Sequence, residues 1–143
     1  MTVIAFDGKA VAADRLAVQG GGIGRSVTKI ERFGNCVLAV TGGWDIGMEL
    51  RAWFKAGAVP SDFPSKARDG DATLIVFDPD TGYVRSYNSG PYDLPMLLAR
   101  CAFGSGRDYA EAAMYLGCDA VKAVEVASHF QTDCGLGVDT IEL

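Results

Sequence analysis

Thr2 follows the initiator methionine directly, in a chain that begins MTVIAFDGKA. A threonine hydroxyl is a poor nucleophile unless a base takes its proton. Once Met1 is removed, the free α-amine of the same residue can act as that base, directly or through water. Its reference pKa of about 7.7–8.0 leaves a useful fraction neutral near pH 7. Threonine is also an ordinary strand residue, so Thr2 becomes a candidate nucleophile only in the company of other reactive residues.

Further candidates stand where predicted strands and helices begin or end: Asp14, Lys29, Gly42, Gly43 and Ser105. Each of them also has an ordinary structural interpretation. The aspartate could cap a turn, the lysine could be a surface charge, and the glycines could form a strand-to-helix turn. The serine could be a helix-start residue. The residue types alone therefore leave both interpretations open.

The elements that must position these residues begin with a strand that is apolar on both faces, which predicts burial on both faces. Three hairpins are predicted: 2–6 with 10–13 around a type I′ turn at Asp7-Gly8, 27–33 with 36–40 around Gly34-Asn35, and 73–77 with 83–87 around 78–82. Further strands are predicted at 96–102 and 138–143, and loops at 18–24 and 58–71.

Three helices complete the pattern. The first is predicted from the spacing of Ile46, Leu50, Trp53 and Phe54 and ends near Gly57. The second runs from about residue 108 to Gly117, and the third follows the N-cap Asp119. The inward face of the third helix is predicted to carry Ala120, Val124, Ala127 and Phe130. Two antiparallel sheets between helical layers would cover a strand that is apolar on both faces, so we expect one α+β domain over residues 1–143.

The composition excludes several classes of protein. A formal net charge of −5 without a long Lys/Arg cluster argues against nucleic-acid binding. No apolar run approaches a membrane span, and no signal-peptide pattern opens the chain, so we expect a cytoplasmic protein with no membrane partner. Cysteines stand singly at 36, 101, 118 and 134, and His129 is the one histidine. We expect buried free thiols, a structural histidine, no metal site and no cofactor.

Short segments along the chain match one known pattern in order: Thr2, Ala13-Asp14, Lys29-Ile30, Thr41-Gly42-Gly43 and Phe103-Gly104-Ser105-Gly106, with the alanine-rich stretch that follows. Together they resemble β-type proteasome subunits and the bacterial HslV-type subunits, among the N-terminal nucleophile (Ntn) hydrolases. The resemblance covers nearly the whole chain. It implies a compact variant of the four-layer αββα sandwich and a threonine exposed as the first mature residue. Methionine before a small residue is the usual substrate for methionine removal, so no propeptide is expected.

The resemblance also implies a role for each candidate. Thr2 is the nucleophile, Lys29 places an ammonium beside it, and Asp14 pairs with that lysine. A backbone N–H at the Gly42-Gly43 turn forms the oxyanion hole, and Gly42 aligns best. Ser105 helps to relay the proton of the threonine amine. Candidates for the substrate side-chain pocket are Val27, Glu31, Val40 and Trp44.

Two features depart from the family pattern. Active subunits often carry Asp-x-x-Ser-Gly late in the chain, whereas residues 132–137 offer Asp133 but place Leu136 where the serine would stand. Asp133 then supports the amine by itself, or the support is partial. The family's second central helix has no counterpart between residues 58 and 71, so subunit number and ring geometry stay open.

We therefore expect a threonine-type peptidase that acts on peptide or protein substrates in a proteasome-like assembly. The resemblance and a mean hydropathy of +0.15 favour a homo-oligomer, and an ATP-dependent unfoldase is a further partner that the resemblance suggests. Two alternatives stay open: a catalytically silent structural subunit, and an Ntn amidohydrolase that acts on a small amide. Retention of Asp14, Lys29 and the glycine turn favours activity over silence.

Overall fold

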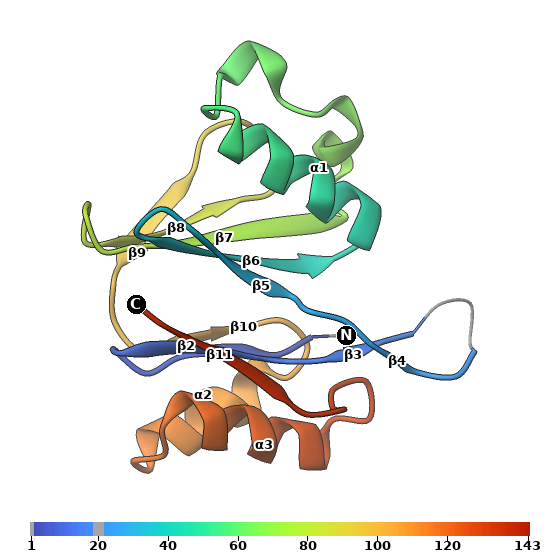
Figure 1. Ribbon diagram of the computed structural model, residues 1–143, viewed down its shortest axis with the longest axis vertical. Coiled ribbons are helices and arrows are strands. Elements are labelled where there is room, and N and C mark those ends of the chain that lie inside the picture. The colour runs from blue at the N-terminus through green and yellow to red at the C-terminus, as the bar shows by residue number, and fades with distance from the viewer. Residues whose placement is uncertain (1, 19–21) are drawn as a thin grey trace. The chain divides into compact units, whose positions relative to one another are not determined.

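A computed structural model describes residues 2–18 and 22–143 (Figure 1). The chain divides into two compact units, which are Met1–Glu31 with Ala99–Leu143, and Arg32–Leu98. Met1, whose removal we expect, and residues 19–21 of the predicted 18–24 loop lie outside the described residues. In the part of the chain that the structure describes, no helix has the length and apolar character needed to cross a bilayer.

The first unit is built on an antiparallel sheet with the strand order β10-β1-β2-β11. Its strands are β1 (Ile4–Phe6), β2 (Ala10–Asp14), β10 (Cys101–Phe103) and β11 (Val138–Glu142). Two helices, α2 (Arg107–Tyr115) and α3 (Ala120–Phe130), lie together on one face of this sheet (Figure 1). A short pair, β3 (Leu16–Ala17) and β4 (Arg25–Ser26), follows β2. The sequence therefore holds both ends of the chain in one sheet.

The opening strand is buried on both faces, as its two apolar sets predict. Val3 and Ala5 pack with Ala12 of β2 against the two helices. Ile4 and Phe6 alternate with them and are also almost fully withdrawn from solvent. Small side chains on α2 and α3 allow this close packing, because helices approach a sheet most closely over alanine and glycine.

The second unit is a five-stranded antiparallel sheet with the order β5-β6-β7-β8-β9, and α1 (Trp44–Lys55) packs on it. The strands are β5 (Ile30–Phe33), β6 (Cys36–Gly42), β7 (Ala72–Asp78), β8 (Tyr83–Tyr87) and β9 (Leu94–Leu97). Two 3₁₀ turns, η1 (Pro60–Asp62) and η2 (Ser65–Asp69), occupy the segment predicted as a loop. Edge-to-face contacts of Trp53 with Phe63 and Tyr87 fill the core beneath α1.

The predicted α+β class with two antiparallel sheets and helical cover is confirmed, and several boundaries are corrected. Strand β5 begins at Ile30 rather than Val27. The strand predicted at 96–102 is two strands, β9 and β10, which belong to different sheets. Phe130 is 59% exposed and stacks on Tyr109 instead of facing inward, because it lies beside the α3 stripe that buries Ala120, Val124 and Ala127.

The first hairpin turn differs from the type I′ turn that the Asp7-Gly8 pair predicts. Ala58 and Leu136 are the non-glycine residues with positive φ among those described, so Asp7 does not have the backbone that a type I′ turn needs. Gly8, at φ +101°, and Lys9 form the tip instead. The Asp7 carboxylate accepts from the N–H groups of Lys9 and Ala10. Asp7 therefore stabilises the turn from the position before Gly8.

Candidate functional site

The carboxylate of Asp14 lies where β2 ends and is completely buried. Its Oδ1 accepts from the N–H of Val3 at 3.0 Å and from Lys29 Nζ at 2.8 Å. Its Oδ2 accepts from the N–H of Gly135 at 3.0 Å and of Leu16 at 3.3 Å. These donors come from distant parts of the chain, so one buried carboxylate ties the start of β1 to the segment before β11.

Lys29 precedes β5, and its side chain is only 4% exposed. A buried ammonium is tolerated when it is paired and hydrogen-bonded, and Asp14 provides both. Two residues before Lys29, the backbone N–H of Val27 donates to the Arg15 carbonyl at 2.8 Å, which fixes the backbone that leads into Lys29. Because Lys29 Nζ and the N–H of Val3 share the same oxygen, the positive charge lies close to the backbone that follows Thr2.

Thr2 is 6% exposed, and its backbone contacts the turn that leads into α2. Its nitrogen donates to Ser105 Oγ at 3.1 Å, and its carbonyl accepts from the N–H of Gly106 at 3.2 Å. Ser105 Oγ in turn donates to Asp133 Oδ1 at 3.1 Å. The structure thus brings together three predicted site residues, Thr2, Ser105 and Asp133. The first and the last of them are more than a hundred positions apart in the sequence.

Gly104 must be glycine for this contact to exist. Its φ of +93° belongs to the left-handed region, and a Cβ at this position would collide with the carbonyl oxygen of Thr2. A Cβ at Gly106 would come within 2.8 Å of the Val3 side chain. The Gly104-Ser105-Gly106 sequence therefore lets the turn approach Thr2 closely enough for the serine hydroxyl to reach its nitrogen.

The Asp133 carboxylate is held in its ionised form. Burial acts to raise its pKa, but hydrogen bonds from the side chains of Gln131 and Ser105 outweigh this and lower the pKa below its usual value. Leu136, at the position of the family's serine, has a backbone φ of +60° and a side chain that is 55% exposed. An apolar side chain there brings no hydrogen-bonding group, so the Asp133 carboxylate makes the contact with Ser105.

Gly42 and Gly43 lie in the second unit, at the end of β6. The N–H of Gly43 donates to the Asp71 carbonyl at 2.8 Å. Hydrogen-bonded and non-hydrogen-bonded pairs alternate along an antiparallel ladder, so the Gly42–Ala72 pair is non-hydrogen-bonded. The N–H of Gly42 consequently points away from β7. Of the two glycines, Gly42 has the N–H that β7 does not use.

The four predicted pocket residues have different environments. Val27 and Glu31 are half-buried in the first unit, and Trp44, the first residue of α1, is 44% exposed. Val40 is 4% exposed and belongs to the core beneath α1, where its side chain packs on Gly47. The sequence alternation that places Leu38 and Val40 on one face of β6 turns Val40 toward the helix, so its side chain is committed to packing.

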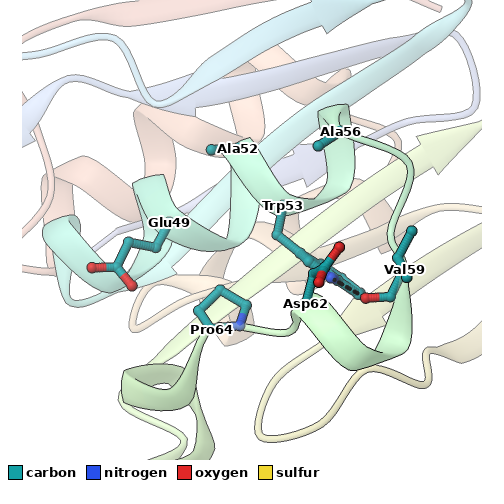
Figure 2. A pocket seen from close by; sticks show the side chains of 7 residues that line it. All are labelled: Glu49, Ala52, Trp53, Ala56, Val59, Asp62 and Pro64. Atoms are coloured by element: carbon teal, nitrogen blue, oxygen red, sulfur yellow. Dashed lines mark hydrogen bonds between the residues drawn. The ribbon is translucent and has the colours of Figure 1, made fainter.

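A hollow lies in the second unit, between α1 and the η1 segment (Figure 2). It measures about 400 Å³ and is lined by Glu49, Ala52, Trp53, Ala56, Val59, Asp62 and Pro64. Trp53 Nε1 donates to the Val59 carbonyl at 2.8 Å across its floor, the contact drawn as a dashed line in Figure 2. None of the residues predicted for the site lines this hollow.

The sequence analysis missed two neighbours of the network. Gly135 donates its N–H to Asp14, and Cys134 lies against both Ser105 and Asp133. Cys134 follows the predicted Asp133 directly in the sequence, and Gly135 comes one residue later. That proximity was the available signal, but the sequence pattern of Cys134 indicates only a buried thiol.

No protein-family model and no curated protein matches the sequence. Solved structures do match it over its full length. BPH of Thiobacillus denitrificans superposes with a TM-score of 0.74 in complex with epoxomicin and 0.73 without it, at 23% identity and with 98% and 97% of those chains covered. Eukaryotic HslV of Trypanosoma brucei superposes with a TM-score of 0.74, at 20% identity and with 99% of that chain covered. The chain has the fold of HslV and BPH.

This HslV-like fold is the one that the resemblance in the sequence implies. At 20–23% identity the superposition establishes the fold and leaves the chemistry to the residues of the chain itself. Those residues include the ion pair of Asp14 with Lys29 and the connection of Thr2 with Ser105 and Asp133.

Proposed function

We propose that this chain is a threonine-type peptidase of the proteasome-like kind, with Thr2 as the nucleophile once Met1 has been removed. The observation that carries the proposal is the hydrogen-bonded connection from the Thr2 nitrogen through Ser105 to Asp133. The buried Lys29–Asp14 pair supports it. Removing two charges from water costs free energy, and a role in the reaction would explain why the chain has such a pair. The solved structures of this fold include BPH in complex with epoxomicin, a peptide epoxyketone.

The proposed reaction is an acyl transfer through the threonine. The Thr2 hydroxyl oxygen attacks the amide carbonyl carbon while the hydroxyl proton passes to the α-amine. The tetrahedral intermediate collapses as the C–N bond breaks and the leaving nitrogen takes that proton, which leaves an ester on Thr2. Water then attacks the ester with the amine again as base. The carboxylic acid leaves, and the threonine hydroxyl is restored.

Each neighbouring group has a proposed part in this sequence. Lys29 supplies positive charge near the reacting groups, and Asp14 positions Lys29. Ser105 and Asp133 orient the α-amine and stabilise its protonated form. The N–H of Gly42 is the proposed oxyanion donor, supported by its direction away from β7, and Gly43 is the alternative.

The wider assignments rest on the same resemblance. Val27, Glu31 and Trp44 are proposed to contact the substrate side chain, whereas the side chain of Val40 packs beneath α1. Copies of the chain are proposed to associate in the cytoplasm, and Tyr92, Leu94 and Leu97 at the β9 edge are more than 60% exposed, which supports association. An ATP-dependent unfoldase would deliver folded protein substrates. Light scattering at micromolar concentration tests the association, and a monomer contradicts it.

The function is tested by labelling with epoxomicin in two forms of the chain, one with Met1 and one from which Met1 has been removed. An epoxyketone adds covalently to a hydroxyl and a neighbouring free amine. We therefore expect the intact mass of the Met1-free form to rise by the full mass of the inhibitor, with the adduct mapping to Thr2. The form that keeps Met1 has an amide nitrogen at this position and stays unlabelled.

Three variants sharpen this experiment. Thr2→Ala should lose both labelling and peptide hydrolysis, whereas Thr2→Ser should keep part of each because a hydroxyl and an amine remain. Thr81→Ala, in the exposed turn before β8, removes a threonine hydroxyl away from the network and should behave as the parent. Equal hydrolysis by Thr2→Ala and the parent would put the nucleophile elsewhere. A Met1-free chain that neither labels nor hydrolyses peptides would support the silent-subunit alternative.

A further inference from the structure

Cys134 forms a triangle with the two groups that connect to the Thr2 nitrogen. Its Sγ lies 3.8 Å from Ser105 Oγ and 3.7 Å from Asp133 Oδ1, and these two oxygens are 3.1 Å apart. Both sulfur contacts are within the range of a weak thiol hydrogen bond. The sulfur therefore touches each end of the Ser105–Asp133 hydrogen bond.

The thiol has little freedom to leave this position. Cys134 is 5% exposed and packs in the core cluster of the first unit with Val3 and Ala127. Its backbone N–H donates to the Gln131 carbonyl at 3.2 Å, and a Cβ added at Gly106 would come within 3.3 Å of the sulfur. Glycine at 106 thus leaves just enough room for the sulfur to reach Ser105.

We propose that Cys134 is a positioning residue for the reaction of Thr2: its thiol donates to Asp133 and prevents the Ser105 hydroxyl from turning away from the Thr2 nitrogen. The inference rests on the proposed function and adds a residue that the sequence resemblance does not supply. In this proposal the thiol supports the Ser105–Asp133 contact. Leu136 does not support this contact, because its side chain is exposed and apolar.

The protonation state of the thiol agrees with a donor role. Burial, with the negative charges of Asp14 and Asp133, raises the pKa of Cys134 to about 11, against a smaller opposite effect of Ser105 and Lys29. The thiol is consequently neutral at physiological pH and carries a proton that it can donate. The same neutrality makes it a poor nucleophile, so the thiol acts through its contacts.

The charged groups around the Thr2 nitrogen give the proposal a measurable consequence. Asp133, through Ser105, favours the protonated α-amine, Lys29 disfavours it, and Asp14 offsets Lys29. If loss of the thiol loosens the Ser105–Asp133 contact, the carboxylate stabilises the ammonium less. The pKa of the Thr2 amine then falls, and the acid limb of kcat/KM moves to lower pH.

The experiment titrates the α-amine of Met1-free protein through the ¹³C shifts of labelled threonine, alongside kcat/KM against pH for a peptide substrate. Cys134→Val removes the donor and fills the site with apolar atoms, so we expect the amine pKa to fall by about half a unit and kcat/KM to fall about threefold to tenfold. Cys134→Ser restores a donor and should return both quantities toward the parent. Asp133→Asn gives the full shift for reference, and Cys118→Ala controls for loss of a thiol elsewhere in the same core.

The outcomes separate this inference from the proposed function. If Cys134→Val leaves the amine titration and the acid limb unchanged, or if Cys134→Ser fails to restore them, the thiol only fills space and the inference is overturned. Should Cys134→Val not fold, Cys134→Ala takes its place in the comparison with Cys134→Ser. A parent chain that hydrolyses no peptide refutes the proposed function, whereas the amine titration still decides whether Cys134 positions Ser105 and Asp133.

Discussion

Lys29 Nζ lies 2.8 Å from Asp14 Oδ1, and neither side chain is exposed by more than 4%. Withdrawing two charges from water is costly, and the attraction between them offsets that cost only when the remaining hydrogen-bonding capacity is also satisfied. Asp14 meets this condition, because three backbone N–H groups also donate hydrogen bonds to its carboxylate. The pair is therefore sensitive to the loss of either member.

Replacing one member should destabilise the chain strongly. Asp14→Asn leaves the Lys29 ammonium buried without its counter-charge, and Lys29→Met leaves the carboxylate in the same state. We expect each to lower the free energy of unfolding by about 3–5 kcal/mol, measured by urea denaturation at pH 7. The double variant should lose less than the sum of the two single losses, since no uncompensated charge remains.

An exposed ion pair provides the control for this measurement. Lys66 Nζ lies 3.6 Å from Glu49 Oε1, with side chains 74% and 42% exposed. Lys66→Met should change the free energy of unfolding by no more than about 0.5 kcal/mol. If Lys29→Met costs as little as Lys66→Met, the buried pair does not hold the first unit together.

The close approach of Gly104 to Thr2 can be tested with a glycine of similar backbone. Gly8 has φ +101° with nothing near a would-be Cβ, so Gly8→Ala carries only backbone strain of about 1–2 kcal/mol. Gly104→Ala adds the collision with the Thr2 carbonyl and should cost about 1–3 kcal/mol more. Thermal unfolding of both variants measures the difference, and equal losses would mean that Thr2 moves aside freely.

Local patterns were sufficient to predict the two sheets and the three helices. Hairpins, helical spacing and the Asp119 N-cap, which accepts from the N–H of Lys122, are properties of neighbouring residues. The division of residues 96–102 into two strands was missed, because both pieces are short and pair with strands that are remote in sequence. Strand pairing depends on tertiary contacts that a single segment does not encode.

The contacts of the candidate site depend even more on tertiary structure, so local sequence patterns predict them less well. No periodicity connects Thr2 with Ser105 and Asp133, so that association came from the resemblance and not from the pattern. The backbone donors to Asp14 were not predicted, since every residue but proline has an N–H and only the fold decides where it points. Cys134 was missed for a related reason: a buried thiol next to other apolar residues has the same sequence pattern whether or not it touches a reactive group.

Stability should also fall at alkaline pH because of Cys101. Burial, with a smaller contribution from the Glu111 charge, raises the pKa of this thiol to about 12 from a reference of 9.0. Between these values the unfolded chain loses a proton that the folded chain keeps, so the free energy of unfolding declines as pH rises. Cys101→Ala should flatten this decline in urea titrations between pH 8 and 11 under reducing conditions. Cys134, whose pKa is raised to about 11, keeps part of the slope. An unchanged slope in Cys101→Ala would contradict the assignment.

The neighbouring glycines at the end of β6 make the last prediction, because one substitution should be tolerated and the other should not. Gly43 has φ −63° as the N-cap of α1, and a Cβ there would lie 3.6 Å from the Asp71 carbonyl, an ordinary contact. Gly42 has φ +87°, and a Cβ there would collide with the same carbonyl and lie 2.9 Å from Ala72 Cα.

Gly43→Ala should therefore keep both the parent melting temperature and the parent kcat, since alanine retains the N–H that donates to Asp71. Gly42→Ala should displace the N–H proposed to bind the oxyanion and lower kcat by about 10²–10³-fold. Loss of kcat beyond what the melting temperature explains separates this effect from unfolding, and a larger loss of kcat in Gly43→Ala than in Gly42→Ala would assign the oxyanion donor to Gly43.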